Sequence, residues 1–158
     1  MSQGHPLPRL PRLPRLPSLP RLQRLPDWPL RLEALLAARA TQPFAWGSQD
    51  CATFAADAVQ ALTGVDVAPP HLRQHRHARA ALRSLRRHGG LHGIAQAALG
   101  TPIAPALAGV GDVLLTLPSA QSHHPMLALC NGASAIAPGP QGLVSLGLGH
   151  VSHAWRVG

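Results

Sequence analysis

Apolar positions in the first two thirds of the chain recur at helical spacing. Leu32, Leu35 and Leu36 repeat every three or four residues behind Asp27, which is a suitable N-cap. The residue before Pro43 avoids the helical conformation, so this first helix ends near Ala40. The same spacing predicts further helices over residues 50–63, 71–88 and 94–99.

From Gly111 onward the pattern changes to short apolar runs that are typical of strands. These runs predict strands over residues 113–117, 126–130, 134–137, 143–146 and 154–157. Asn131-Gly132 between two of them is a strong signal for a tight antiparallel turn. Helices followed by a small antiparallel sheet indicate an α+β fold.

The first 26 residues follow neither pattern, because they repeat Pro-Arg-Leu four times. Proline at every third position removes amide donors and fixes φ, which forbids a helix and favours an extended polyproline II conformation. We therefore predict a disordered, low-complexity arm over residues 1–26 and one folded domain over residues 27–158.

Charge adds a possible class of partner to this picture. The chain carries 14 Lys+Arg, all of them Arg, against 6 Asp+Glu, and its formal net charge is +8. A basic arm and a basic helix over 71–88 can attract polyanions such as nucleic acid. Aromatic residues are only 3% and no known nucleic-acid motif is present, so the sequence gives nucleic-acid binding little support.

Other classes are excluded by what the chain lacks. No run of 18 uncharged apolar residues is present, so we expect no membrane-spanning helix. The Pro/Arg-interrupted N-terminus does not resemble a secretory signal peptide. Cys51 and Cys130 are too few for a disulfide scaffold.

The strongest candidate for chemistry is Cys51, in the first turn of the predicted helix 50–63. A helix N-terminus stabilises a thiolate through its dipole and its free amides. A histidine within hydrogen-bond reach would complete a Cys–His nucleophile, and His123 and His124 precede the strand 126–130. The alternative is that Cys51 is a small buried helix residue, which is the usual role of cysteine.

Several other polar residues favour structural roles. Asp50 stands where it would cap the helix 50–63, and Asp57 lies two turns into that helix, where we expect a surface charge. His71 and His75 have a spacing that suits a metal on one helix face. No nearby carboxylate or cysteine completes such a site, so we expect a solvated basic face and no bound metal.

Three blocks of the sequence resemble a known family. Residues 46–54, Trp-Gly-Ser-Gln-Asp-Cys-Ala-Thr-Phe, resemble the Trp-Gly-x-x-Asp-Cys-x-x-Phe nucleophile segment of NlpC-type cell-wall cysteine peptidases. Residues 111–115 resemble that family's Gly-Asp strand opening, and residues 124–132 are similar in spacing to its histidine strand and turn. Residues 43–47, 63–66 and 154–157, and the arginine-rich segment before Gly89-Gly90, resemble a branch of this family encoded in phage and prophage tail clusters. The resemblance covers residues 27–158.

The resemblance implies a papain-like fold with the cysteine helix packed on a small antiparallel sheet. It also implies Cys51 as nucleophile and His124 as general base. The family's third polar residue falls near Ile136, which leaves Ser134 as the nearest polar side chain. The weaker catalytic candidates are Asp50, His123 and Ser134. Trp46 and Ser48, just before the cysteine, are the candidates for substrate binding.

The function implied is a tail-associated thiol peptidase or amidase that acts on peptidoglycan peptides without a cofactor. Its partners would be peptidoglycan or phage tail proteins, and it would be made in the bacterial cytoplasm before any incorporation into a tail. The alternative is a tail-assembly component that keeps the fold without catalysis. Ile136, and Pro125 directly after His124, favour this alternative. A nucleic-acid-binding accessory is the third hypothesis.

Overall fold

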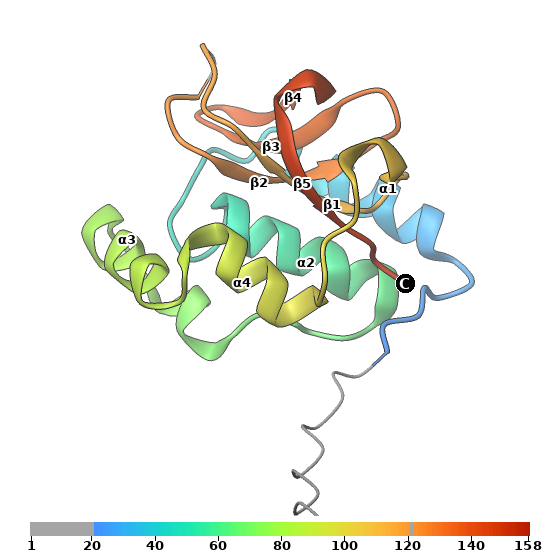
Figure 1. Ribbon diagram of the computed structural model, residues 1–158, viewed down its shortest axis with the longest axis horizontal. Coiled ribbons are helices and arrows are strands. Elements are labelled where there is room, and N and C mark those ends of the chain that lie inside the picture. Colours follow the sequence, from blue (N-terminus) through green and yellow to red (C-terminus); the bar gives the residue numbers. More distant parts are fainter. Residues whose placement is uncertain (1–20, 121) are drawn as a thin grey trace, which may run out of the picture.

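The computed structural model describes residues 21–120 and 122–158, which form helices on one side of an antiparallel sheet (Figure 1). The α-helices are α1 (Trp28–Arg39), α2 (Cys51–Thr63), α3 (Ala78–Arg87) and α4 (Gly90–Leu99). The strands are β1 (Val113–Thr116), β2 (Met126–Cys130), β3 (Ala135–Gly139), β4 (Gly142–Leu146) and β5 (Val151–Trp155). Short 3-10 turns occupy Pro70–Gln74 (η1), Pro105–Leu107 (η2) and Leu148–His150 (η3). The α+β class predicted from the sequence is confirmed.

The sheet has the strand order β4-β3-β2-β1-β5, and every neighbouring pair is antiparallel. Side chains alternate between its two faces. On β2, Leu127 and Leu129 belong to the core that includes α2, whereas Ala128 and Cys130 belong to a second cluster on the other face. This alternation decides which residues of the strand can approach the cysteine helix.

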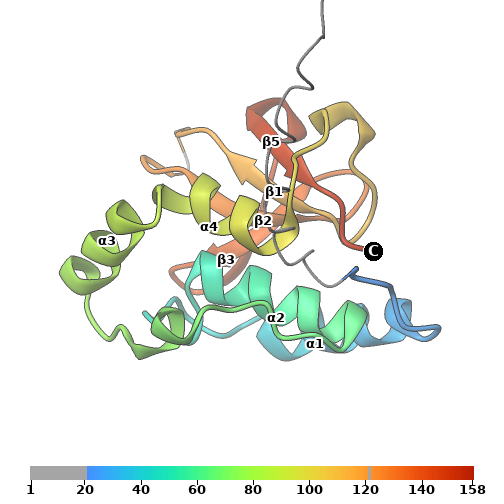
Figure 2. The ribbon, with the colours of Figure 1, turned by 60° about the horizontal axis from the view of Figure 1, so that its bottom comes forward.

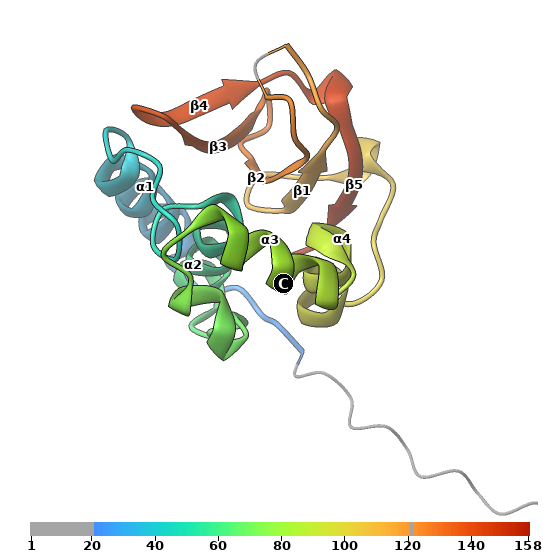
Figure 3. The ribbon, with the colours of Figure 1, turned by 90° about the vertical axis from the view of Figure 1, so that its left-hand side faces the viewer.

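Helix α2 is the centre of the core. Phe54, Ala58 and Leu62 on α2 have no exposed surface, and Trp155 of β5 is equally buried. Figure 2 shows α1 beside α2 beneath the sheet, and Figures 1 and 2 show α3 at the edge of this arrangement, which faces the viewer in Figure 3. The many alanines of α2 let the helix lie close to the sheet and to its neighbours.

The basic segment 71–88 differs from its predicted form. It is not one helix but two pieces, η1 and α3, because His75 and His77 adopt extended backbone conformations. Leu72 of η1 joins the core that includes α2, and α3 packs mainly against α4. One straight helix does not make both contacts, so the helical spacing of the apolar residues in this segment wrongly predicted a single helix. Helix α4 also begins earlier than predicted, directly at Gly90.

The folded part also begins earlier than Asp27. Most of the predicted Pro-Arg-Leu arm lies outside the described residues. Its last part does not, and the Leu25 N–H donates to the Leu62 carbonyl at 2.8 Å. The guanidinium of Arg24 lies 4.4 Å from the ring centroid of Trp28. The chain end lies beside this segment (Figures 1 and 3), where Arg24 Nε donates to the Val157 carbonyl at 2.6 Å.

Candidate functional site

Cys51 is the first residue of α2, and Asp50 caps the helix in front of it. The Asp50 backbone is extended, and its carboxylate accepts hydrogen bonds from Thr53 N at 2.8 Å and from Thr53 Oγ1 at 3.0 Å. The same carboxylate accepts from Gly47 N at 2.7 Å. Asp50 therefore connects the preceding loop to the helix, which is the structural role expected of it.

The thiol of Cys51 is partly buried and packs against the core, close to the backbone of Leu127 on β2. Burial raises the pKa of Cys51 from 9.0 to about 11, and the negative charge of Asp50 adds to the rise. The Leu127 amide and the first amides of α2 lower it in part. The helix N-terminus thus acts on the thiol in the expected direction, but desolvation outweighs it, and the thiol is protonated at neutral pH.

His123 and His124 are both exposed in the segment before β2. His124 borders a groove of about 820 Å³, together with Phe44, Met126 and Val144. Met126 and Val144 pack on the sheet face that looks away from α2. The structure therefore places the Cys51 thiol on the inner side of β2 and His124 beside the groove on the outer side. Within the described residues no hydrogen bond joins Cys51 to a histidine.

The position predicted for a third catalytic residue is apolar. Ile136 pairs with Leu129 in the sheet and packs against the core that contains α2. Ser134 lies in the turn before β3, where its Oγ is 3.1 Å from Asn131 Oδ1 and 2.7 Å from Ser145 Oγ. These bonds give Ser134 a role in the turn between β2 and β3.

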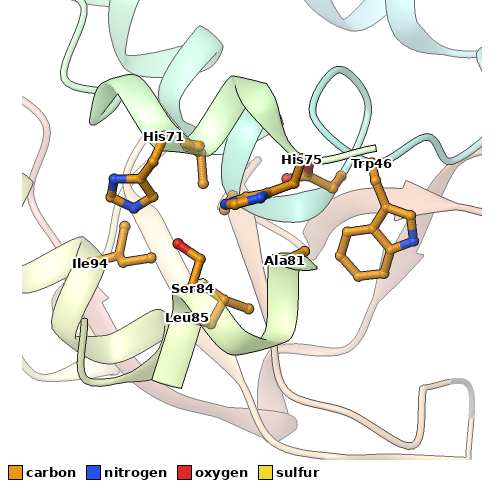
Figure 4. Close-up of a pocket in the computed structure, with 10 residues that line it drawn as sticks. Trp46, His71, His75, Ala81, Ser84, Leu85 and Ile94 are labelled. Atoms are coloured by element: carbon orange, nitrogen blue, oxygen red, sulfur yellow. The ribbon is translucent and has the colours of Figure 1, made fainter. Parts of the chain in front are cut away.

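Trp46 and Ser48 occupy the loop before α2. Trp46 meets Phe44 edge-on, with ring centroids 4.8 Å apart, and is half-buried. Ser48 is exposed, its N–H lies 3.3 Å from the Ala45 carbonyl, and its own carbonyl accepts from Arg39 Nη1 at 3.0 Å. Trp46 faces a small cavity between α2, η1 and α3 (Figure 4), so the loop packs toward the helices.

That cavity reveals a histidine cluster where the sequence predicted a solvated face. The rings of His71 and His88 are stacked at 4.1 Å, and the centroids of His71 and His75 are 6.2 Å apart. The Nε2 atoms of His71 and His75 are buried without a hydrogen-bond partner among the described residues. Burial lowers the pKa of His71, and the charges of His88 and His75 lower it further. The density of histidines between residues 71 and 88 was the available signal.

These histidines do not form a metal centre of the usual kind. Parallel stacking keeps the nitrogens of His71 and His88 from converging on one point. Across residues 21–120 and 122–158, no group of three or more His, Cys, Asp or Glu side chains is placed to hold a metal ion.

Asp57 is also more important than predicted. Its carboxylate pairs with Arg39 of α1 at 2.6 Å and with Arg73 of η1 at 2.7 Å, and its side chain is only 13% exposed. The prediction of a surface charge was wrong, because Asp57 on α2 forms ion pairs that connect this helix to α1 and to η1.

Comparison with known proteins gives a family but no activity. The family model described as "Domain of unknown function (DUF6950)" matches residues 23–157. No curated protein matches the chain. No helix in the described part of the chain has the length and apolar character needed to cross a membrane.

Proposed function

Since the chain belongs to the DUF6950 family, whose name states no activity, we propose a function from its own site: a non-catalytic assembly component of a phage or prophage tail. In this proposal the chain keeps an NlpC-type, papain-like architecture and uses it as a structural module. The environment of Cys51, at the place where the resembling peptidases have their nucleophile, supports the non-catalytic part of the proposal. The tail setting rests on the sequence resemblance.

The Cys51 thiol is poorly suited to nucleophilic attack. A pKa of about 11 leaves about one molecule in ten thousand as thiolate at pH 7. Thiol enzymes work in the opposite direction and lower this pKa with a neighbouring cation, because the thiolate is the attacking species. Here the nearest charge that acts on the thiol is the anionic Asp50, which raises the pKa.

The surroundings of Cys51 favour packing. The thiol lies between α2 and β2, in the same core as Ile136. The resemblance assigns the position of Ile136 to the polar residue that orients the imidazole. Without that partner a histidine tautomer is not fixed, which costs related triads orders of magnitude in rate. Cys51 then serves as a small residue that lets α2 lie close to β2.

A thiol peptidase or amidase acting on peptidoglycan peptides is the second candidate. Its supporting observation is that Cys51 is the first residue of α2 and is only partly buried, behind a loop held by Asp50. In that mechanism the Cys51 sulfur attacks the amide carbonyl and His124 takes the thiol proton and passes it to the leaving amine. Residues 122–125 would have to move to bring His124 to the inner side of β2.

The pH dependence of Cys51 alkylation separates the two candidates. Iodoacetamide labelling is followed by mass spectrometry in a Cys130→Ala background. Cys130 is buried beside Ala128 and Ala135, so we expect alanine to fit there. The assembly proposal expects the labelling rate to rise up to at least pH 10, with no change on His124→Ala. An apparent pKa below the free-thiol value of about 8.5 that rises on His124→Ala would establish the peptidase instead.

A further inference from the structure

We infer that the hollow between η1 and α3 is a binding site for a phosphate-class oxyanion, held by Arg83, Arg87, His71, His75 and Ser84. The hollow has a volume of about 340 Å³, and these five residues line it together with His88. This inference does not depend on the role of Cys51 and goes beyond the proposed assembly function.

The first support is that two ring nitrogens beside the hollow have no hydrogen-bond partner among the described residues. The Nε2 atoms of both His71 and His75 are shielded from solvent and have no partner in the described residues. A buried ring nitrogen without a partner costs free energy. Because solvent does not reach either Nε2 atom in this structure, a bound oxyanion would recover that free energy once the rings turned toward the hollow. Figure 4, which draws the adjacent small cavity, shows the Ser84 hydroxyl directed into the space between these two rings. Three groups that can donate hydrogen bonds, on side chains that line both the small cavity and the hollow, thus lie together.

The second support is the charge around the hollow. Arg83 and Arg87 are one helical turn apart on α3 and both line the hollow. Unlike Arg39 and Arg73, neither makes an ion pair within the described residues. None of the described residues that line the hollow is an Asp or Glu. The adjacent small cavity does contain Asp50, but its carboxylate is already engaged by Gly47 and Thr53.

The charge decides between an anion and a metal ion. Two imidazole nitrogens alone would also suit a transition metal. The two guanidinium groups repel a cation and attract an anion, and Arg pairs readily with phosphate oxygens through two parallel hydrogen bonds. A tetrahedral oxyanion presents more acceptor oxygens than a planar carboxylate to donors that come from both η1 and α3.

The matched variants for the test lie on the same helix. Arg83→Gln/Arg87→Gln removes the two arginines of the hollow. Arg79→Gln/Arg86→Gln removes the same charge from positions on α3 that do not line it. All four side chains belong to exposed residues, so both proteins should fold, and thermal melting verifies this.

Inorganic phosphate is titrated into the full chain at low salt, with the ring ¹⁵N shifts of His71 and His75 followed by NMR. Loss of charge-assisted hydrogen bonds should weaken binding by roughly tenfold or more in Arg83→Gln/Arg87→Gln and by less than about twofold in the control pair. Equal weakening in both pairs would overturn the site, because that is general attraction to a basic helix. So would histidine shifts produced by Zn²⁺ and not by phosphate.

A short DNA duplex, titrated in parallel, identifies the source of the phosphate group. Displacement of phosphate by the duplex, with the same histidine shifts, indicates that the site takes backbone phosphodiesters. Histidine shifts with inorganic phosphate alone indicate a small phosphate ligand. No shift with either probe contradicts the inference.

Discussion

Arg24 and Asp112 form an ion pair of 3.1 Å across 88 residues of sequence. Asp112 is almost fully buried, and its carboxylate also accepts from Val157 N at 3.0 Å and from Gly109 N at 2.9 Å. Arg24 in turn donates to the carbonyls of Val157 and Val110. The pair thus connects the segment before α1, the start of β1 and the end of the chain.

Arg24→Ala should lower the free energy of unfolding by about 3 kcal/mol, because it leaves a buried carboxylate without its cation. Chemical denaturation measures the change. Arg21→Ala is the matched control, since Arg21 lies in the same segment and makes no ion pair within the described residues. Equal stability of the two variants would show that the Arg24 contacts contribute little to folding.

Single residues in the sequence correctly predicted the two ends of α2 and the turn between β2 and β3. Asp50 and Gly64 mark the two ends of α2, and the structure has Asp50 as N-cap and Gly64 at φ 77° after the last turn. Asn131-Gly132 lies between β2 and β3 as predicted. In each case one residue type satisfies backbone groups that lie within a few positions of it.

The sequence did not show which residues far apart in the chain would pair with one another. Arg24 belongs to the basic N-terminal segment, Asp57 has the spacing of a helix surface residue, and His71 is one of ten histidines. Each acquires its role from a partner that the fold brings from elsewhere. The sequence also did not show which face of β2 His124 would approach. His124 lies before the strand, where the alternation of side chains no longer fixes their direction.

Asp57→Asn should destabilise the protein by about 2 kcal/mol, because two arginines on α1 and η1 lose a shared carboxylate that is largely buried. Thermal and urea unfolding measure the loss. Asp66→Asn serves as the control, since Asp66 is 46% exposed and meets Arg73 only at 3.5 Å. An exposed pair of this kind contributes about 1 kcal/mol or less. A loss in Asp66→Asn as large as in Asp57→Asn would contradict the central role of Asp57.

Asp50→Asn should lower the pKa of Cys51, because the negative charge of Asp50 is one of the causes that raise it. Asparagine is also a good N-cap, so the helix start should persist. The alkylation rate of Cys51 against pH should shift toward lower pH, whereas Asp27→Asn, an exposed change on α1, should leave it in place. An unchanged profile in Asp50→Asn would leave burial as the whole explanation of the high pKa.

The histidine cluster should make the fold sensitive to mild acid. Burial, followed by the charges of His88 and His75, lowers the pKa of His71 below its ordinary value of 6.5 in the folded state. The folded protein therefore binds this proton less readily than the unfolded chain. The contribution to stability is present above pH 6.5 and is lost as pH falls through the folded pKa.

Urea unfolding between pH 8 and pH 5, in buffer free of phosphate, should show this decline, and His71→Gln should flatten it. His77→Gln, at the exposed start of α3, should not. The groups that line the hollow beside His71 are cationic or able to become so: His75, Arg83, Arg87 and His88. Asp50 lines the adjacent small cavity with His71, but its carboxylate is engaged by Gly47 and Thr53. Protonation therefore adds repulsion, and a bound oxyanion should reduce the acid sensitivity. A decline that is the same in His71→Gln as in the unmodified chain would assign the acid sensitivity to other groups.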